Sequence, residues 1–390
     1  MQDIVLTRQG AMPLPGSQRD VPAETRPDEQ ARQRRSDAIG IARVLCILGV
    51  VYVHAWTGLG GNGLELARGT FQENLRWVLM ECFGRSAVPL LGLISGWLVM
   101  ASLAERDGRR RDWAGHVGRK ARTVLLPMVV WNAIALVLVS GTAWLFTLPA
   151  PVPHSLGWTI EELLILTRNP DINVQMPFLR DLFVCMVLAP ALVRLPARAL
   201  GLIALAAGIA QVFALGWPIF LRPSILTFFA LGMIARQTGA AERVAEWPLS
   251  RAVLPFAVLL PVKLALEFTL PDPGAMPAFV AFDLTVRIAA AFAFWRIAWA
   301  VAGSDARGRL LALEPYAFFL FCAHLTLIWL FAPLIGRLTG PLGSPLYPLF
   351  LILQPLLVLG ATLAVAIPLS RHWPAAARVL SGGRLGRRRP

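Results

Sequence analysis

The sequence is poor in charged residues and in cysteine. Only 15% of its 390 residues are charged and only four are cysteines, whereas soluble domains carry about 25% charged residues. This composition excludes an ordinary soluble globule and a disulfide framework. The cysteines lie singly inside apolar runs, without metal-ligand spacing, and are typical of small core residues: Cys46, Cys82, Cys185 and Cys322.

Several catalytic signatures are also missing from the sequence. It contains no HExxH, P-loop or GxSxG motif, and no GxGxxG that follows a strand, so metalloprotease, nucleotide hydrolase and soluble hydrolase functions lack support. Residues 1–36 are polar and have no apolar stretch that could form the core of a signal peptide. We therefore expect a disordered cytoplasmic tail there, and we expect no metal site.

Long apolar runs dominate the rest of the chain. Hydrophobic residues make up 56% of the sequence, and the mean hydropathy is +0.60. A helix needs about 20 residues to cross a hydrocarbon core of about 30 Å. The sequence thus predicts an all-α polytopic membrane protein, with a bundle of about ten transmembrane helices over residues 37–370 and a basic cytoplasmic tail over 371–390. The predicted spans are Ala38–Leu59, Val78–Leu103, Thr123–Leu148, Pro177–Leu195, Ala199–Trp217, Pro218–Ala235, Ala252–Leu270, Ala278–Ala302, Leu310–Gly336 and Leu346–Ser370.

The basic residues follow the pattern of membrane topology. The formal net charge is +14, yet the arginines lie in short tracts between apolar runs, without the continuous basic face of a nucleic-acid-binding protein. Basic loops alternate with loops that carry few cations, and cytoplasmic loops retain positive charge during insertion. We therefore expect no nucleic-acid partner. The pattern predicts a multi-pass membrane protein with both termini in the cytoplasm. We expect it in a bacterial inner membrane.

Two ionisable residues lie within the first predicted span. A charge at the middle of a bilayer costs about 2.5–3.5 kcal/mol on insertion scales, so a retained one needs a partner, a wet cavity or a function. Ten residues separate Arg43 from His54, which places them about 16 Å apart along a helix and within about 20° of one face. Arg43 could bind a phosphate, and a neutral His54 could take a proton from a hydroxyl. Alternatively, Arg43 reaches lipid headgroups and His54 is an interfacial histidine.

The second span and the loop after it add further candidates. Ser95 and Gly96, within VPLLGLISGWLV, either line a cavity or allow close helix packing, and packing is the commoner role of small residues. Arg119 and Arg122 stand three positions apart before the third span and so share a helix face. This arginine pair can clamp a polyphosphate, or it can anchor the chain at the cytoplasmic surface.

The later spans carry more ionisable residues. Arg180 and Asp181 are adjacent, point about 100° apart on a helix and need separate partners. Glu314 begins the ninth span, and His324 lies near its middle. An isolated intramembrane histidine is more often a hydrogen-bonded packing residue than a catalyst, unless a second histidine faces the same cavity. Two further pairs have the i, i+4 spacing of ion pairs within one helix and indicate structural roles: Lys263 with Glu267, and Asp283 with Arg287.

These motifs form an ordered set that resembles a known family. Arg43-x10-His54, VPLLGLISGWLV, Arg119-x-x-Arg122 and a histidine in the ninth span are together similar to the membrane-bound acyltransferase family 3, and the resemblance covers most of residues 37–370. The chain departs from the family pattern at one place. The family often has an acidic residue about three positions before its first-span Arg or Lys, where this chain has Gly40.

The resemblance implies a ten-helix enzyme that transfers an acyl group, usually acetyl and alternatively succinyl, from cytoplasmic acyl-CoA to a hydroxyl of a surface, periplasmic or lipid-linked carbohydrate. It implies that His54 is the general base or acyl relay and that Arg43, Arg119 and Arg122 contact the coenzyme phosphates. A hydroxyl acceptor requires a base whose pKa lies near neutral pH, and cationic side chains suit a donor that carries several phosphates. The predicted donor site also includes Ser95, and the predicted substrate site includes Arg180, Asp181, Glu314 and His324.

Other functions remain open from the sequence. Paired intramembrane charges in a polytopic bundle are also found in transporters and flippases, although no internal repeat is evident in this chain. A membrane scaffold without catalysis would leave His54 and the cytoplasmic arginine pair without a role. The sequence does not decide between acetyl and succinyl, and it does not identify the acceptor.

Overall fold

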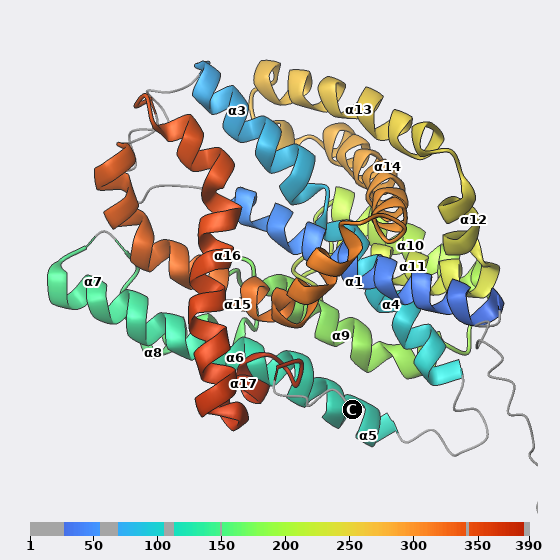
Figure 1. Cartoon of the computed structure of the whole chain (residues 1–390), viewed down its shortest axis with the longest axis horizontal. Helices are drawn as coiled ribbons and strands as arrows, with labels where there is room; N and C mark the ends of the chain where they lie inside the picture. The colour runs from blue at the N-terminus through green and yellow to red at the C-terminus, as the bar shows by residue number, and fades with distance from the viewer. Residues whose placement is uncertain (1–26, 55–68, 105–112, 149, 341–342, 386–390) are drawn as a thin grey trace, which may run out of the picture.

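The computed structural model describes residues 27–54, 69–104, 113–148, 150–340 and 343–385 (Figure 1). These residues form helices and contain no strand, which confirms the all-α prediction. A helix satisfies its backbone polar groups internally, as a bilayer requires. The α-helices are α1 (Pro27–Val53), α3 (Phe71–Leu79), α4 (Val88–Ala104), α5 (Trp113–Lys120), α6 (Leu126–Ala135), α7 (Gly141–Phe146), α8 (Leu156–Leu164), α9 (Pro177–Leu192), α10 (Ala197–Val212), α11 (Ser224–Thr238), α12 (Ala240–Glu246), α13 (Leu249–Thr269), α14 (Pro277–Val301), α15 (Arg307–Thr339), α16 (Tyr347–His372) and α17 (Pro374–Leu380).

Short irregular turns interrupt or join these helices. Three are π-helical: η1 (Met80–Arg85) joins α3 to α4, η2 (Ala121–Leu125) joins α5 to α6, and η3 (Leu136–Ser140) joins α6 to α7. A 3₁₀ turn, η4 (Pro273–Ala275), precedes α14. Because π turns change the direction of side chains and often occur at functional sites, η1 and η2 mark two regions for attention.

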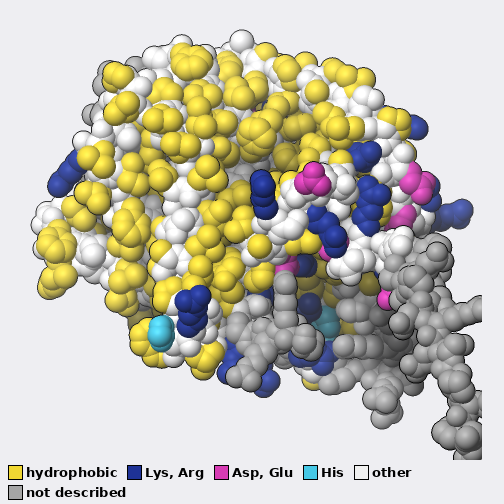
Figure 2. Space-filling model, in the orientation of Figure 1, with side chains coloured by type: hydrophobic (Ala, Val, Ile, Leu, Met, Phe, Trp, Pro, Cys, Tyr) yellow, Lys and Arg dark blue, Asp and Glu magenta, His cyan; other side chains and the backbone are white. Residues whose placement is uncertain are grey.

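Seven helical segments of the described chain are long and apolar enough to cross a membrane. The three other predicted spans correspond to α9, α10 and α11, which have 16, 16 and 15 residues. These helices are shorter than the length of about 20 residues that a straight crossing needs. Figure 2 shows a broad apolar surface over much of one face, with charged side chains gathered toward one side of it. The polytopic bundle is confirmed, whereas the count of ten stays a prediction.

Helix α1 lies inside the bundle and packs against α15, η1, α14, α16 and α4. Arg43 of α1 contacts Glu314 of α15, and His54, eleven positions later, contacts His324, ten positions after Glu314. Because both contacts occur in the same order along the two helices, α1 and α15 run parallel and in register. This pair of helices is the frame of the candidate site.

Glycines set the close packing of α4 on α11. A Cβ added at Gly96 would lie 1.9 Å from Phe229 O, and one added at Gly232 would lie 2.0 Å from Leu93 O. Only glycine allows the two backbones to approach this closely, as is typical of helix contacts in membranes. The packing interpretation of the Ser95-Gly96 pair is therefore correct for Gly96.

Ordered helix extends into both predicted tails. Helix α1 begins at Pro27, well before the predicted boundary at residue 37, and there the guanidinium of Arg34 stacks over Trp299 and that of Arg35 over Trp97. At the other end, the indole N–H of Trp131 in α6 donates a hydrogen bond of 3.0 Å to Leu380 O of α17. Cation–π stacking and this hydrogen bond offset the entropy cost of ordering the two segments.

Candidate active site

Two histidines meet inside the bundle. The ring centroids of His54, just after α1, and His324, in α15, lie 5.3 Å apart with planes inclined by 41°. His324 is fully buried and His54 is half-buried. The packing interpretation of His324 applied to an isolated histidine. The structure places a second histidine, His54, against it, and this arrangement favours a functional role. We call these two residues the histidine pair.

The hydrogen bonds of His324 show which ring nitrogen carries the proton. Nδ1 lies 2.8 Å from Phe321 O and 3.3 Å from Leu320 O. A carbonyl oxygen only accepts, so in the neutral ring Nδ1 is protonated and donates to these carbonyls. Nε2 then holds a lone pair, and no described residue donates to it although it is buried. This nitrogen can accept a proton from a substrate hydroxyl or a hydrogen bond from His54.

Arg43 lies at the other end of the same helix pair. Its NH1 is 3.3 Å from Oε1 of Glu314, and both side chains are about one-third exposed. Glu314 therefore belongs with Arg43, about 15 Å along α15 from His324. The structure thus divides the predicted site into a charged end and a histidine end, which α1 and α15 connect.

More cations surround Arg43. Lys120, the last residue of α5, interacts electrostatically with Arg43, Arg119 and Arg384, and Arg384 interacts with Arg43 and Glu314. We call Arg43, Lys120 and Arg384 the cationic mouth. Partial loss of surrounding water and repulsion from Arg43 lower the pKa of Arg384 to about 10, although the residue keeps exposed surface, so its guanidinium is still protonated at neutral pH. Grouped cations repel one another unless an anion binds between them.

The predicted donor residues outside this cluster have different surroundings. Arg119 and Arg122 are both exposed, and the π turn η2 begins between them at Ala121, which weakens the face sharing of a regular helix. Ser95 Oγ donates a hydrogen bond of 2.8 Å to Leu91 O of its own helix, an arrangement that favours the packing interpretation. Roles of these three residues in donor binding stay predictions.

Arg180 and Asp181 hold a loop in place. Their side chains pair at 2.7 Å, and Arg180 also donates to Leu166 O and Pro218 O at 3.0 and 2.8 Å. The fully buried Asp181 accepts from the backbone N–H of Arg222 at 2.7 Å. Each residue therefore has the separate partners that the sequence required, and together they fix the segment before α11.

This segment brings Arg222 toward the histidine pair. The guanidinium of Arg222 donates to Val174 O at 3.1 Å, and the charges of Arg222 and Arg85 both act on His54. Arg85 belongs to η1 and has its own carboxylate partners, Glu81 at 2.6 Å and Glu267 at 3.6 Å. Arg222 differs from Arg85 in that its described side-chain hydrogen bond goes to a backbone carbonyl, while it interacts electrostatically with Asp181.

A network of ion pairs lies where η1, α13 and α14 meet. Lys263 pairs with Glu81 and, at 2.6 Å, with Asp283, which also pairs with Arg287 at 2.5 Å. The predicted Asp283–Arg287 pair is confirmed. Lys263 instead contacts carboxylates of η1 and α14, so this network joins three elements and is structural in character.

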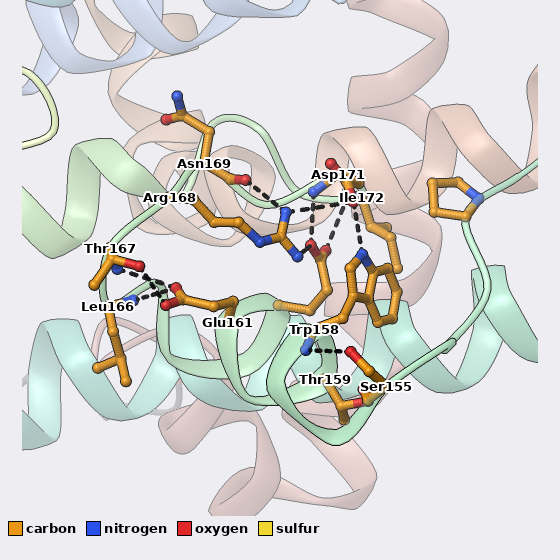
Figure 3. A network of polar contacts seen from close by, with 12 residues as sticks. Ser155, Trp158, Thr159, Glu161, Leu166, Thr167, Arg168, Asn169, Asp171 and Ile172 are labelled. Carbon is orange, nitrogen blue, oxygen red and sulfur yellow. Dashed lines mark hydrogen bonds and ion pairs between the residues drawn. The ribbon is translucent and has the colours of Figure 1, made fainter.

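The chain between α8 and α9 folds into the bundle beside α15. The buried Glu162 accepts from the backbone N–H groups of Asp171 and Ile172 at 2.8 and 3.1 Å. Figure 3 shows the Trp158 indole beside Asp171, to which it donates at 2.7 Å. Burial raises the pKa of Glu162. The next residues include the buried side-chain amides of Asn173 and Gln175. Asn173 donates to the Asn132 side chain at 3.0 Å.

Parallel apolar helices with a histidine pair inside and cations at one end fit the class of membrane acyltransferases. The profile of the family described as "Acyltransferase domain" matches residues 36–371, and the chain belongs to this family. It is also similar to the succinoglycan biosynthesis protein ExoH of Rhizobium meliloti (strain 1021), with 29% identity over 368 residues, or 91% of this chain and 94% of the relative. No solved structure matches the chain closely. Family membership supports an acyltransferase over a transporter, flippase or scaffold.

Sequence reasoning missed three cations that the fold brings to the site. Lys120 is one of only two lysines and stands between the two predicted arginines. Arg222 is an isolated cation before Pro223 in an otherwise apolar segment, which is a signal by the cost of such charges. Arg384 lies in a basic tail, and an excess of arginine is expected in any cytoplasmic segment of a membrane protein. Nothing in the sequence therefore singled it out.

Proposed function

We propose that this protein is an O-acyltransferase that moves an acyl group from cytoplasmic acyl-CoA to a hydroxyl of a surface, periplasmic or lipid-linked carbohydrate. The observation that carries the proposal is the histidine pair. Acyl transfer to a hydroxyl, the reaction of this family, needs a base, and a histidine can supply it. A relative named for succinoglycan biosynthesis supports a carbohydrate acceptor. We place the protein in a bacterial inner membrane with both termini in the cytoplasm, because the basic loops then lie on that side.

The cationic mouth is proposed to bind the donor. Acyl-CoA carries several phosphates, and guanidinium groups bind phosphate through charge-assisted, bidentate hydrogen bonds. Arg43 and Lys120 are within one electrostatic cluster, and Arg119 and Arg122 extend it on the exposed side. The acyl thioester would then extend from this mouth along α1 and α15 toward the histidine pair.

The histidine pair is proposed to perform the proton transfers. His54 takes the proton of the acceptor hydroxyl while the hydroxyl oxygen attacks the thioester carbonyl carbon. The new C–O bond forms, the C–S bond breaks, and the proton on His54 passes to the leaving thiolate. The two ring centroids are 5.3 Å apart, and Nε2 of His324 has no hydrogen-bond partner among the described residues. A small rotation of His54 would let Nε2 of His324 accept its N–H and stabilise the imidazolium.

Arg222 favours succinyl over acetyl as the transferred group. Its charge acts on His54, and a cation beside the reacting thioester would pair with the free carboxylate of a succinyl group. An acetyl group offers no such carboxylate. The Arg222→Gln variant should therefore lose activity with succinyl-CoA more than with acetyl-CoA.

The test uses the purified protein in detergent with acetyl-CoA, succinyl-CoA and free CoA. We expect saturable binding of the acyl donor by calorimetry and transfer to a carbohydrate acceptor. His54→Ala should lower turnover by about 10²–10⁴-fold and keep donor binding, while His372→Ala, an exposed histidine at the end of α16, should behave as wild type. Normal turnover in His54→Ala would remove the catalytic role, and absence of donor binding would refute the proposed reaction.

A further inference from the structure

Residues 374–385, the last part of the chain that the structure describes, fold against the bundle and supply Arg384 to the cationic mouth. We propose that residues 374–385 complete the donor site and that Arg384 binds a phosphate group of the acyl donor. This inference rests on the proposed function. The segment lies outside residues 36–371, which the family profile matches.

The segment is docked against the bundle. Ala377 and Ser381 are fully buried and Leu385 is 4% exposed, and the Trp131 indole of α6 holds Leu380 O at 3.0 Å. Figure 1 shows α17 beside α6 at the end of the molecule where α5 lies. A tail whose only role was to keep positive charge in the cytoplasm would have no need to bury side chains against the bundle.

A tight turn then directs Arg384 toward the mouth. Gly382 and Gly383 have φ of +59° and +82°, values that favour glycine. A Cβ at Gly382 would lie 2.3 Å from Thr123 O, so a larger residue would displace the turn from η2. The Ser381 hydroxyl accepts from the backbone N–H groups of Arg384 and Leu385 at 3.2 and 2.8 Å and fixes the far side of the turn.

The Arg384 side chain is held but keeps open edges. Its guanidinium lies 3.9 Å from the centroid of the Phe318 ring in α15. NH1 donates to Ser381 O at 3.1 Å and to Thr123 O at 3.5 Å, and the side chain remains exposed. A guanidinium carries five N–H donors, so most of them are available to a ligand.

The position of Arg384 matches that of a phosphate ligand. It interacts electrostatically with Arg43 and Lys120, and its Thr123 contact lies next to the predicted donor residue Arg122. Glu314 balances part of this positive charge. An anion with several phosphates would neutralise the rest, and it would be held between α1, η2 and the C-terminal turn.

The experiment measures acyl-CoA binding by calorimetry with the full-length protein in detergent. Arg384→Met keeps the stem that packs on Phe318 and removes the charge, and we expect its Kd to rise about tenfold, the effect of losing one charge-assisted hydrogen bond. Gly382→Ala keeps Arg384 but displaces the turn, and should weaken binding similarly. Arg378→Met is the matched control, because Arg378 is exposed and bonds to its own helix at Pro374 O.

A second donor separates a phosphate contact from a general effect on folding. Acyl-pantetheine carries the same thioester without the phosphates, so its KM should be equal in the wild type and Arg384→Met. An unchanged Kd for acyl-CoA in Arg384→Met would overturn the inference and leave the proposed function intact. An equal loss with acyl-pantetheine would also overturn it, and a wild-type protein that binds no acyl-CoA would refute the proposed function together with the inference.

Discussion

Replacement of His324 by phenylalanine tests whether the histidine pair acts as a unit. Phenylalanine keeps an aromatic ring against His54 and Phe321, but it has neither the Nδ1–H that donates to Phe321 O at 2.8 Å nor the lone pair of Nε2. The carbonyls of Leu320 and Phe321 belong to α15 and keep their helical hydrogen bonds. We therefore expect the variant to insert and fold like the wild type.

The expected magnitude follows from what the variant loses. Removal of one partner from a buried hydrogen bond costs about 1–3 kcal/mol, which corresponds to about 5- to 150-fold in rate when the bond forms in the transition state. The loss should appear in kcat, because the cationic mouth that binds the donor lies at the other end of α1 and α15. His324→Gln places an amide oxygen near the position of Nε2 and should recover part of the lost turnover.

The assay measures release of CoA thiol in the presence of the carbohydrate acceptor, for both single variants and the double variant. If His324 acts through His54, the double variant His54→Ala/His324→Phe should be no slower than His54→Ala alone, because residues of one unit are not additive. Wild-type kcat in His324→Phe, or losses that multiply in the double variant, would refute this reasoning.

Three further predictions concern packing, buried charge and donor affinity. Gly96→Ala should lower stability by about 1–3 kcal/mol in thermal unfolding, because an added methyl overlaps a backbone oxygen at 1.9 Å, whereas Gly201→Ala, with open space around it, should not destabilise. Lys263→Ala should cost about 3–5 kcal/mol, because it leaves buried carboxylates without their cation; an unchanged melting temperature would contradict this. Glu314→Gln should strengthen acyl-CoA binding in calorimetry, because it removes the carboxylate 3.3 Å from Arg43, and weaker binding would show that Glu314 holds the site together.

The sequence predicted the helices well because hydropathy and periodicity are local properties. The ends of α13, α14 and α16 lie close to the predicted spans, and the charge of Arg43 and the imidazole of His54 were found because each is costly inside an apolar helix. The family resemblance followed from the order and spacing of the same residues. Local signals of this kind cannot show which distant helices meet.

Contacts between distant segments account for what sequence reasoning left open or missed. His324 was indistinguishable from a packing residue until α15 was placed beside α1. Lys263 has Glu267 four residues later, yet it pairs with Glu81, which is 182 positions away. Arg384 depends on a two-glycine turn that fits against Thr123, and no local pattern specifies that fit.

The direction of α1 and α15 limits how many helices cross the membrane. If only the seven long apolar segments crossed, α15 would be the sixth crossing and would run opposite to α1. The contacts of Arg43 with Glu314 and of His54 with His324 show instead that the two helices are parallel. If all seven long segments cross, we therefore expect an odd number among α9, α10 and α11 to cross as well. Since α16 then returns to the side where Arg384 interacts with Arg43, we expect an even total.

Single cysteines on either side of α10 distinguish the remaining topologies. Arg198 and Leu215 are both exposed, and with ten crossings Arg198→Cys should react with an impermeant thiol reagent only from the cytoplasmic side and Leu215→Cys only from the opposite side. Any eight-crossing arrangement would put both cysteines on one side or exchange the two. The unsubstituted protein is the control for labelling of the native cysteines, of which Cys46, Cys185 and Cys322 are buried and Cys82 is partly exposed. Termini on opposite faces of the membrane would contradict the parallel pairing of α1 and α15, and with it the geometry that joins the donor mouth to the histidine pair.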